Sequence, residues 1–170
     1  PTMSEANHLA SVLEEHFSST EASSFVHFVV VTDGLTAQQA ATVPALRFNS
    51  VWAVVNHVAF WQDVLCQQLQ GKSVDLQAWG MSAIGGGWPP LGEITEANWL
   101  AARQRALDIN HTLAAVVRGL TDAQLEQPIM SDGGIPYQWI LSIYAHNSHH
   151  TSEILTIRHM QKLWVDHSWA

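Results

Sequence analysis

The sequence contains very few cysteines and very few positive charges. One Cys among 170 residues excludes an intrachain disulfide framework and a cysteine-based zinc site. Only seven Lys and Arg accompany 15 Asp and Glu, and the formal net charge is −8. Because so few cations cannot neutralise a run of phosphates, we expect no nucleic-acid partner. No apolar run reaches the ~18 residues of a membrane span, and no charged-then-apolar signal opens the sequence. We therefore expect a cytoplasmic protein that does not bind a membrane.

Apolar residues are abundant where charged ones are scarce. The hydrophobic fraction is 47% and the charged fraction 13%, a balance that excludes a disordered chain. The length predicts a single domain over residues 1–170, large enough to bury about two-thirds of its unfolded surface. Eight Trp and ten His stand out in the composition. Low charge combined with many Trp indicates that a partner subunit covers some surface, and we expect a homodimer.

Hydrophobic residues at helical spacing predict four long helices. Gly34 and Gly71 lie where C-terminal caps are expected, and Pro136 is a favourable first-turn residue. No strand pattern competes with this interpretation. The sequence therefore predicts an all-α four-helix bundle with helices over about 4–33, 49–70, 95–118 and 136–164.

Two segments carry information beyond the helix count. The stretch 72–94 contains GGGWPP over residues 85–90, which cannot lie inside a helix. A connection this long suits a crossover between the second and third helices.

The helix over 49–70 has apolar residues on two opposite sides, as a helix that is central or lies in an interface does. A dimer that buries Trp52, or the third helix beside it, would explain this pattern.

The most informative motif is a set of histidines on the last helix. His146 and His150 are four residues apart, so they lie about 6 Å apart along one face of a helix. This spacing lets two imidazoles reach one metal ion. His57 lies in the apolar stripe of the second helix, and facing helices of a bundle can supply ligands to a shared core site. We predict a three-histidine metal site at His57, His146 and His150.

Neighbours of these histidines allow more than one interpretation. Glu153 shares the histidine stripe and could be a fourth ligand, an acceptor for an imidazole N–H, a general base on metal-bound water, or a solvent-facing carboxylate. Trp61, one turn beyond His57, could line the cavity or simply pack in the core. His149 points away from the stripe and is expected to be peripheral. Cys66 lies half a turn from His57, and we interpret it as a packing residue.

The chain resembles the DinB-like (damage-inducible, YfiT-like) superfamily of metal-dependent enzymes. The resemblance rests on SVWAVVNHVAFW over 50–61 and on HNSHHTSEI over 146–154. It implies metal ligands at His57, His146 and His150, an up-down-down-up bundle, a divalent metal and frequent homodimers. Members include thiol-dependent transferases and a mycothiol-dependent maleylpyruvate isomerase. The sequence departs from the family at 151–153, where an Arg-Gly-Gln run is common and Glu153 adds a negative charge.

Three neutral imidazoles would leave a divalent metal with an open position for water or substrate. Zinc and nickel suit such ligands best, and iron or manganese also accept them. We expect an enzyme of the thiol-dependent transferase or isomerase type, which uses a low-molecular-weight thiol. One alternative is a hydrolase that uses metal-bound hydroxide with Glu153 assisting. Another is a non-catalytic module that binds a metal or a small ligand.

Overall fold

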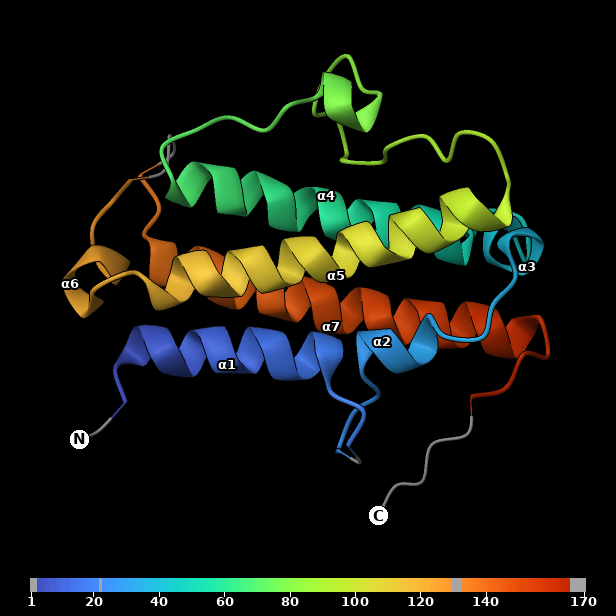
Figure 1. The fold of residues 1–170 in the computed structure, drawn as a ribbon, viewed down its shortest axis with the longest axis horizontal. Helices are drawn as coiled ribbons and strands as arrows, with labels where there is room; N and C mark the ends of the chain where they lie inside the picture. The colour runs from blue at the N-terminus through green and yellow to red at the C-terminus, as the bar shows by residue number, and fades with distance from the viewer. Residues whose placement is uncertain (1–2, 22, 130–132, 166–170) are drawn as a thin grey trace.

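The computed structural model describes residues 3–21, 23–129 and 133–165. All regular structure in these ranges is helical (Figure 1), which confirms the predicted all-α class. The elements are α1 (Glu5–Ser18), α2 (Phe28–Val31), α3 (Ala37–Ala41), α4 (Val51–Leu69), the 3₁₀ turn η1 (Gln77–Trp79), α5 (Glu96–Arg118), α6 (Asp122–Leu125) and α7 (Pro136–Met160).

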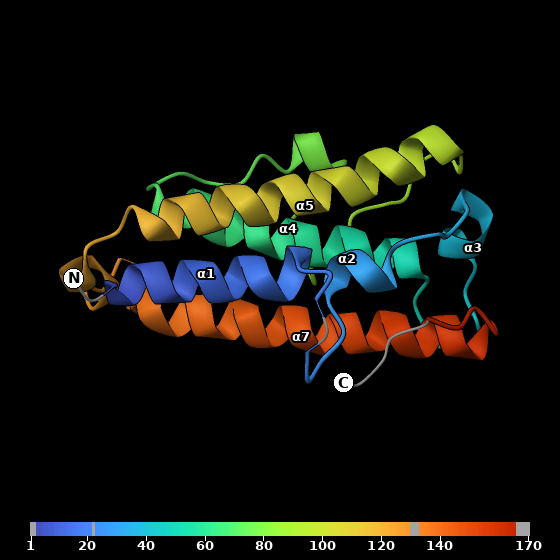
Figure 2. The same cartoon turned by 60° about the horizontal axis from the view of Figure 1, so that its bottom comes forward.

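Four of these helices, α1, α4, α5 and α7, form an elongated bundle (Figures 1 and 2). Helix α4 packs against both α5 and α7, and α1 packs against α5 and α7 from the other side. Helices α4 and α5 run in one direction, whereas α1 and α7 run in the opposite direction (Figure 1). The segment 70–95, which includes η1, crosses back along the outside of the bundle between α4 and α5.

Local capping explains where the bundle helices begin. The Ser50 hydroxyl accepts a hydrogen bond from the Ala53 amide at the start of α4, and Thr95 does the same for Asn98 in α5. Pro136 opens α7, as expected from its fixed φ and missing N–H. The predicted ranges for α4 and α5 therefore agree with the structure to within two residues, and α7 ends at Met160 instead of 164.

The prediction of one helix over residues 4–33 is wrong. The chain leaves α1 at Ser19, whose backbone is extended, and re-enters a helix only at Phe28. The Ser19 hydroxyl accepts a hydrogen bond from the Glu21 amide, the kind of local bond by which serine competes with a helix. The turn lets Phe28 stack on Phe17, with ring centroids 3.9 Å apart, so both aromatic rings are buried in the core.

The two-sided apolar pattern of the second helix reflects a central position. Most of α4 is buried, and its side chains contribute to both apolar clusters of the core. Trp52 is only 1% exposed in the single chain and packs on Trp99 with ring centroids 5.6 Å apart. A dimer therefore has no need to bury Trp52, and the homodimer itself stays a prediction. None of the described helices has the length and apolarity to cross a membrane.

Candidate metal centre

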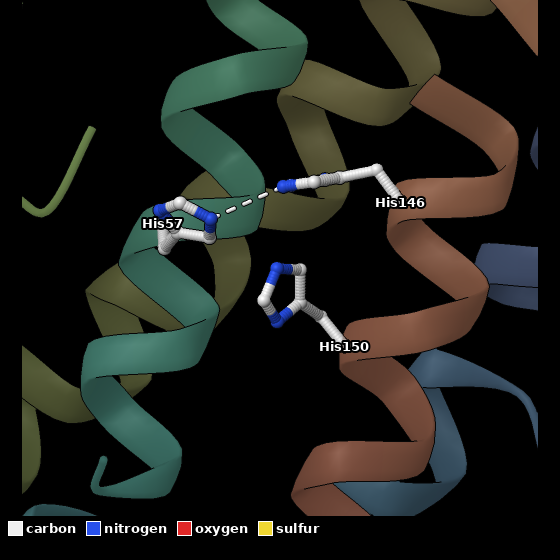
Figure 3. Close-up of side chains that lie close together, drawn as sticks. All are labelled: His57, His146 and His150. Atoms are coloured by element: carbon white, nitrogen blue, oxygen red, sulfur yellow. Dashed lines mark hydrogen bonds between the residues drawn. The ribbon is translucent and has the colours of Figure 1, made fainter. Parts of the chain in front are cut away.

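Three histidines from two helices converge at one point in the bundle (Figure 3). His57 projects from α4, and His146 and His150 project from successive turns of α7. One ring nitrogen from each residue lies within 4.8 Å of the other two. The Nε2 atoms of His57 and His146 are 3.1 Å apart. The fold thus brings together the three residues that the sequence predicts as ligands.

The crossover segment 70–95 contacts the His57 ring at Nδ1 and on one face. His57 Nδ1 lies 2.7 Å from the carbonyl oxygen of Gly87. Because a carbonyl oxygen can only accept, Nδ1 must carry the proton and Nε2 must carry the lone pair. Trp88 stacks on the same imidazole, with ring centroids 3.8 Å apart and planes 12° from parallel. The ring is therefore held in both tautomer and orientation, with its lone pair on the Nε2 atom beside His146.

A glycine is required for this close approach. Gly87 has φ of +71°, a backbone conformation that costs little only for glycine. A Cβ at this position would overlap the indole of Trp61 on α4. The side chain of any other residue would therefore push the segment away from His57.

Glu153 holds His150 in the same way. His150 Nδ1 lies 2.7 Å from Glu153 Oε2, and Asn49 donates to Glu153 Oε1 at 3.1 Å. The hydrogen bond from His150 lowers the pKa of the Glu153 carboxyl, and the one from Asn49 lowers it further, against the opposing effect of burial. An ionised carboxylate can only accept, so His150 donates from Nδ1, and the neutral form of its ring has the lone pair on Nε2.

The surroundings keep two of the imidazoles uncharged. Burial, the largest effect, lowers the pKa of His57 and of His146 to about 4. The neighbouring histidines contribute to this lowering of the pKa at both rings, whereas the hydrogen bond to Gly87 opposes it at His57. Both rings are neutral near pH 7, the form in which an imidazole can bind a metal.

This donor set fits a metal ion. A tetrahedral zinc site with Zn–N bonds of about 2.0–2.1 Å places two ligand nitrogens about 3.3 Å apart, close to the 3.1 Å between His57 Nε2 and His146 Nε2. The acceptors that bind Nδ1 of His57 and of His150 are a backbone carbonyl and a carboxylate, the two kinds that accompany metal-binding histidines. The cluster of His57, His146 and His150 could therefore hold one metal ion.

The remaining sequence candidates lie around this centre. His149 is exposed and forms a second, overlapping group with His150 and Glu153, but Glu153 is already bonded to His150 Nδ1. Cys66 lies in the apolar cluster that contains α1. Burial, the largest effect, raises the pKa of its thiol, and Gln70 donates to its sulfur.

A cavity adjoins the triad on one side. Trp61 and His146 both line it, and Trp61 also packs against both apolar clusters of the core. The sequence reasoning missed Gly87 and Asn49, which contact His57 and Glu153. The glycine run at 85–87 was the only signal for the first of these, because it marks a segment that can approach another backbone closely.

These features define an all-α bundle protein with a three-histidine cluster between two of its long helices. The sequence model of the DinB superfamily matches residues 27–154, a range that includes all three histidines. The chain belongs to the DinB superfamily. No curated protein and no solved structure matches the chain.

Proposed function

We propose that this protein is a divalent-metal-dependent enzyme that acts on small molecules, with His57, His146 and His150 as the metal ligands. The observation that supports this most directly is the pair of hydrogen bonds behind His57 and His150. They place a proton of each ring on Nδ1, so that the neutral form of each ring directs the lone pair of Nε2 toward one shared ion. A packed core would also need an acceptor for each buried N–H, but it would not need one nitrogen from each of three rings to lie within 4.8 Å of the other two.

Three imidazole ligands limit the choice of metal ion but do not identify a single one. Neutral imidazoles suit zinc and nickel, and iron or manganese are weaker alternatives. A divalent ion held by three uncharged ligands keeps its full positive charge, and when bound it lowers the pKa of a coordinated thiol or water. The residues of this chain then have to orient the reactant and exclude competing water.

The contacts of Glu153 weigh against hydrolysis with this carboxylate as the base. Both of its carboxylate oxygens are engaged, one with His150 and one with Asn49. We therefore assign Glu153 the role of orienting His150 and not that of taking a proton from water. Among the residues that the structure describes, no carboxylate lines the adjoining cavity. A hydrolase would then depend on the metal alone to lower the pKa of a bound water, as a transferase would for a bound thiol, so activity assays decide between the two.

Metal content and activity can be tested in one series. We expect elemental analysis of the purified protein to find one divalent ion per chain. Single changes of His57, His146 or His150 to Ala should each remove most of it. The matched control is His149→Ala, which removes an exposed histidine from the same helix. Unchanged metal content in all three variants would show that the assignment is wrong.

Activity assays of the metal-bound protein then identify the class of reaction. We expect thiol transfer to an electrophilic small molecule to depend on added metal, and ester hydrolysis to stay at background. Metal-dependent ester hydrolysis would instead favour the hydrolase alternative. A protein that binds metal with full stoichiometry and turns over neither class would favour a non-catalytic metal-binding module.

A further inference from the structure

An apolar cavity of about 210 Å³ lies between α4 and α7, directly beside the histidine triad. His146 belongs to both, since it is a member of the triad and part of the cavity wall. Any molecule in the cavity is therefore next to the atoms that would bind a metal. The lining residues are Trp61, Val64, Leu65, Gln68, Trp139, Ser142, Ile143 and His146.

The lining divides into an apolar floor and a polar rim. Val64, Leu65 and Ile143 are buried and form the floor. Gln68 and Ser142 are exposed and lie on opposite helices, where they can hydrogen-bond a ligand group at the entrance. A cavity of this construction takes a ligand with an apolar body and one polar group near its outer end.

No charged side chain among the described residues lines this cavity, and two of the few arginines are bonded elsewhere. Arg158 donates to the carbonyls of Val31 and Asp33. Arg103 donates to the carbonyl of Val29. In the metal-free protein, an anionic ligand in this cavity would therefore lose its hydration without gaining a counter-ion, and burying an unpaired charge is strongly unfavourable.

The size of the cavity limits the ligand further. An apolar protein cavity of about 150 Å³ accommodates benzene. The cavity beside the triad, at about 210 Å³, therefore has room for one substituted aromatic ring or a branched aliphatic chain of similar size. The indoles of Trp61 and Trp139 offer aromatic surfaces for such a body.

We propose that the cavity between α4 and α7 is a substrate subsite for the uncharged aromatic or branched aliphatic body of a small molecule. The assignment rests on the proposed function, because the subsite places its ligand beside the candidate metal ligand His146. It narrows that function to acceptors whose part within the cavity carries no carboxylate or phosphate group.

The test uses toluene as the neutral probe and benzoate as its charged counterpart of similar size. Binding to the metal-free protein is measured by titration calorimetry, and the site is located from the indole N–H signals of Trp61 and Trp139 in NMR spectra. We expect toluene to bind with Kd of about 1 mM or tighter, within the range of affinity per atom for small ligands. Benzoate should bind at least about tenfold more weakly.

Two neighbouring substitutions provide the control. Ser142→Phe adds an aromatic ring at the exposed rim and should weaken toluene binding at least about tenfold by filling the cavity. Leu141→Phe adds a ring at the adjacent exposed position, which does not line the cavity, and should leave the affinity unchanged. Trp139→Ala, which removes half-exposed aromatic wall, should also weaken binding.

The proposal is overturned if toluene does not bind, if benzoate binds as tightly, or if Ser142→Phe leaves the toluene affinity unchanged. Since these measurements use metal-free protein, they do not depend on whether the histidines bind a metal. Toluene binding in a protein that takes up no metal would support the cavity and contradict the proposed function. Metal uptake without toluene binding would support the metal site and contradict the proposed subsite in the cavity.

Discussion

The carbonyl oxygen of Gly87 accepts a hydrogen bond from His57 Nδ1 at 2.7 Å, which ties the crossover segment to the histidine triad. The two residues are 30 positions apart in the sequence, and the crossover segment brings them together, with Gly87 against the indole of Trp61 and Trp88 stacked on the imidazole of His57. This segment is thus part of the site and not merely a connection between α4 and α5.

Replacing Gly87 by Ala should weaken metal binding. The added methyl group overlaps the Trp61 indole, so the segment must move and the acceptor behind His57 is lost. Loss of the hydrogen bond that orients a metal-binding histidine lowers metal affinity by about 10- to 100-fold. A calorimetric metal titration would detect this loss. The control is Gly92→Ala, because Gly92 also has positive φ but has no atom within 4 Å of the added Cβ. Equal metal affinities in the two variants would contradict the assigned role of Gly87.

Replacing Glu153 by Gln should weaken metal binding without unfolding the protein. The amide keeps the shape and one acceptor oxygen, but it loses the charge that holds the proton on His150 Nδ1. We expect metal affinity to fall by about 10- to 100-fold, while the melting temperature of the metal-free form changes little. Glu93→Gln, at an exposed loop position, is the charge-matched control. If affinity is retained and the turnover rate drops about 100-fold, Glu153 acts as a general base instead.

Replacing Arg158 by Ala should lower stability and leave metal content unchanged. Arg158 is 8% exposed and donates to backbone carbonyls of Val31, Asp33 and Leu163. Leaving buried acceptors without a donor costs about 1–3 kcal/mol each, so we expect a loss of about 3 kcal/mol in the free energy of unfolding. Denaturant titration measures this loss, with exposed Lys162→Ala as the control. Loss of thiol-dependent activity at unchanged stability would instead indicate that Arg158 binds a substrate.

The scarcity of charge predicts that two copies of the chain associate. We expect light scattering at micromolar concentration to give twice the mass of one chain. The interface must use residues other than Trp52, which is already buried within the chain. Trp52→Phe should therefore leave the association unchanged. A mass equal to one chain at this concentration would contradict the dimer.

Local sequence signals predict the bundle helices well because each signal acts within one turn. Ser50 and Thr95 cap the amides three residues ahead of them, and Pro136 suits a first turn wherever it occurs. The break after Ser18 has only a weaker local signal, Ser19, whose hydroxyl accepts a hydrogen bond from the Glu21 amide. It depends on the stacking of Phe17 on Phe28, a contact between residues on either side of the turn, so periodicity alone extended the helix through it.

The sequence by itself determined the all-α class and which three histidines come together. Helical periodicity placed His146 and His150 on one face of a helix and His57 in the apolar stripe of another. Tertiary structure decided which nitrogen of His57 faces the shared point, since that depends on Gly87 of the crossover segment, whereas the partner of His150 is Glu153, three residues along the same helix. It also decided that Glu153 is engaged at both oxygens, through Asn49, which is 104 positions away in the sequence. The physical reason is one of range: helix periodicity and caps act over three or four residues, whereas hydrogen bonds across a bundle join residues that no local pattern relates.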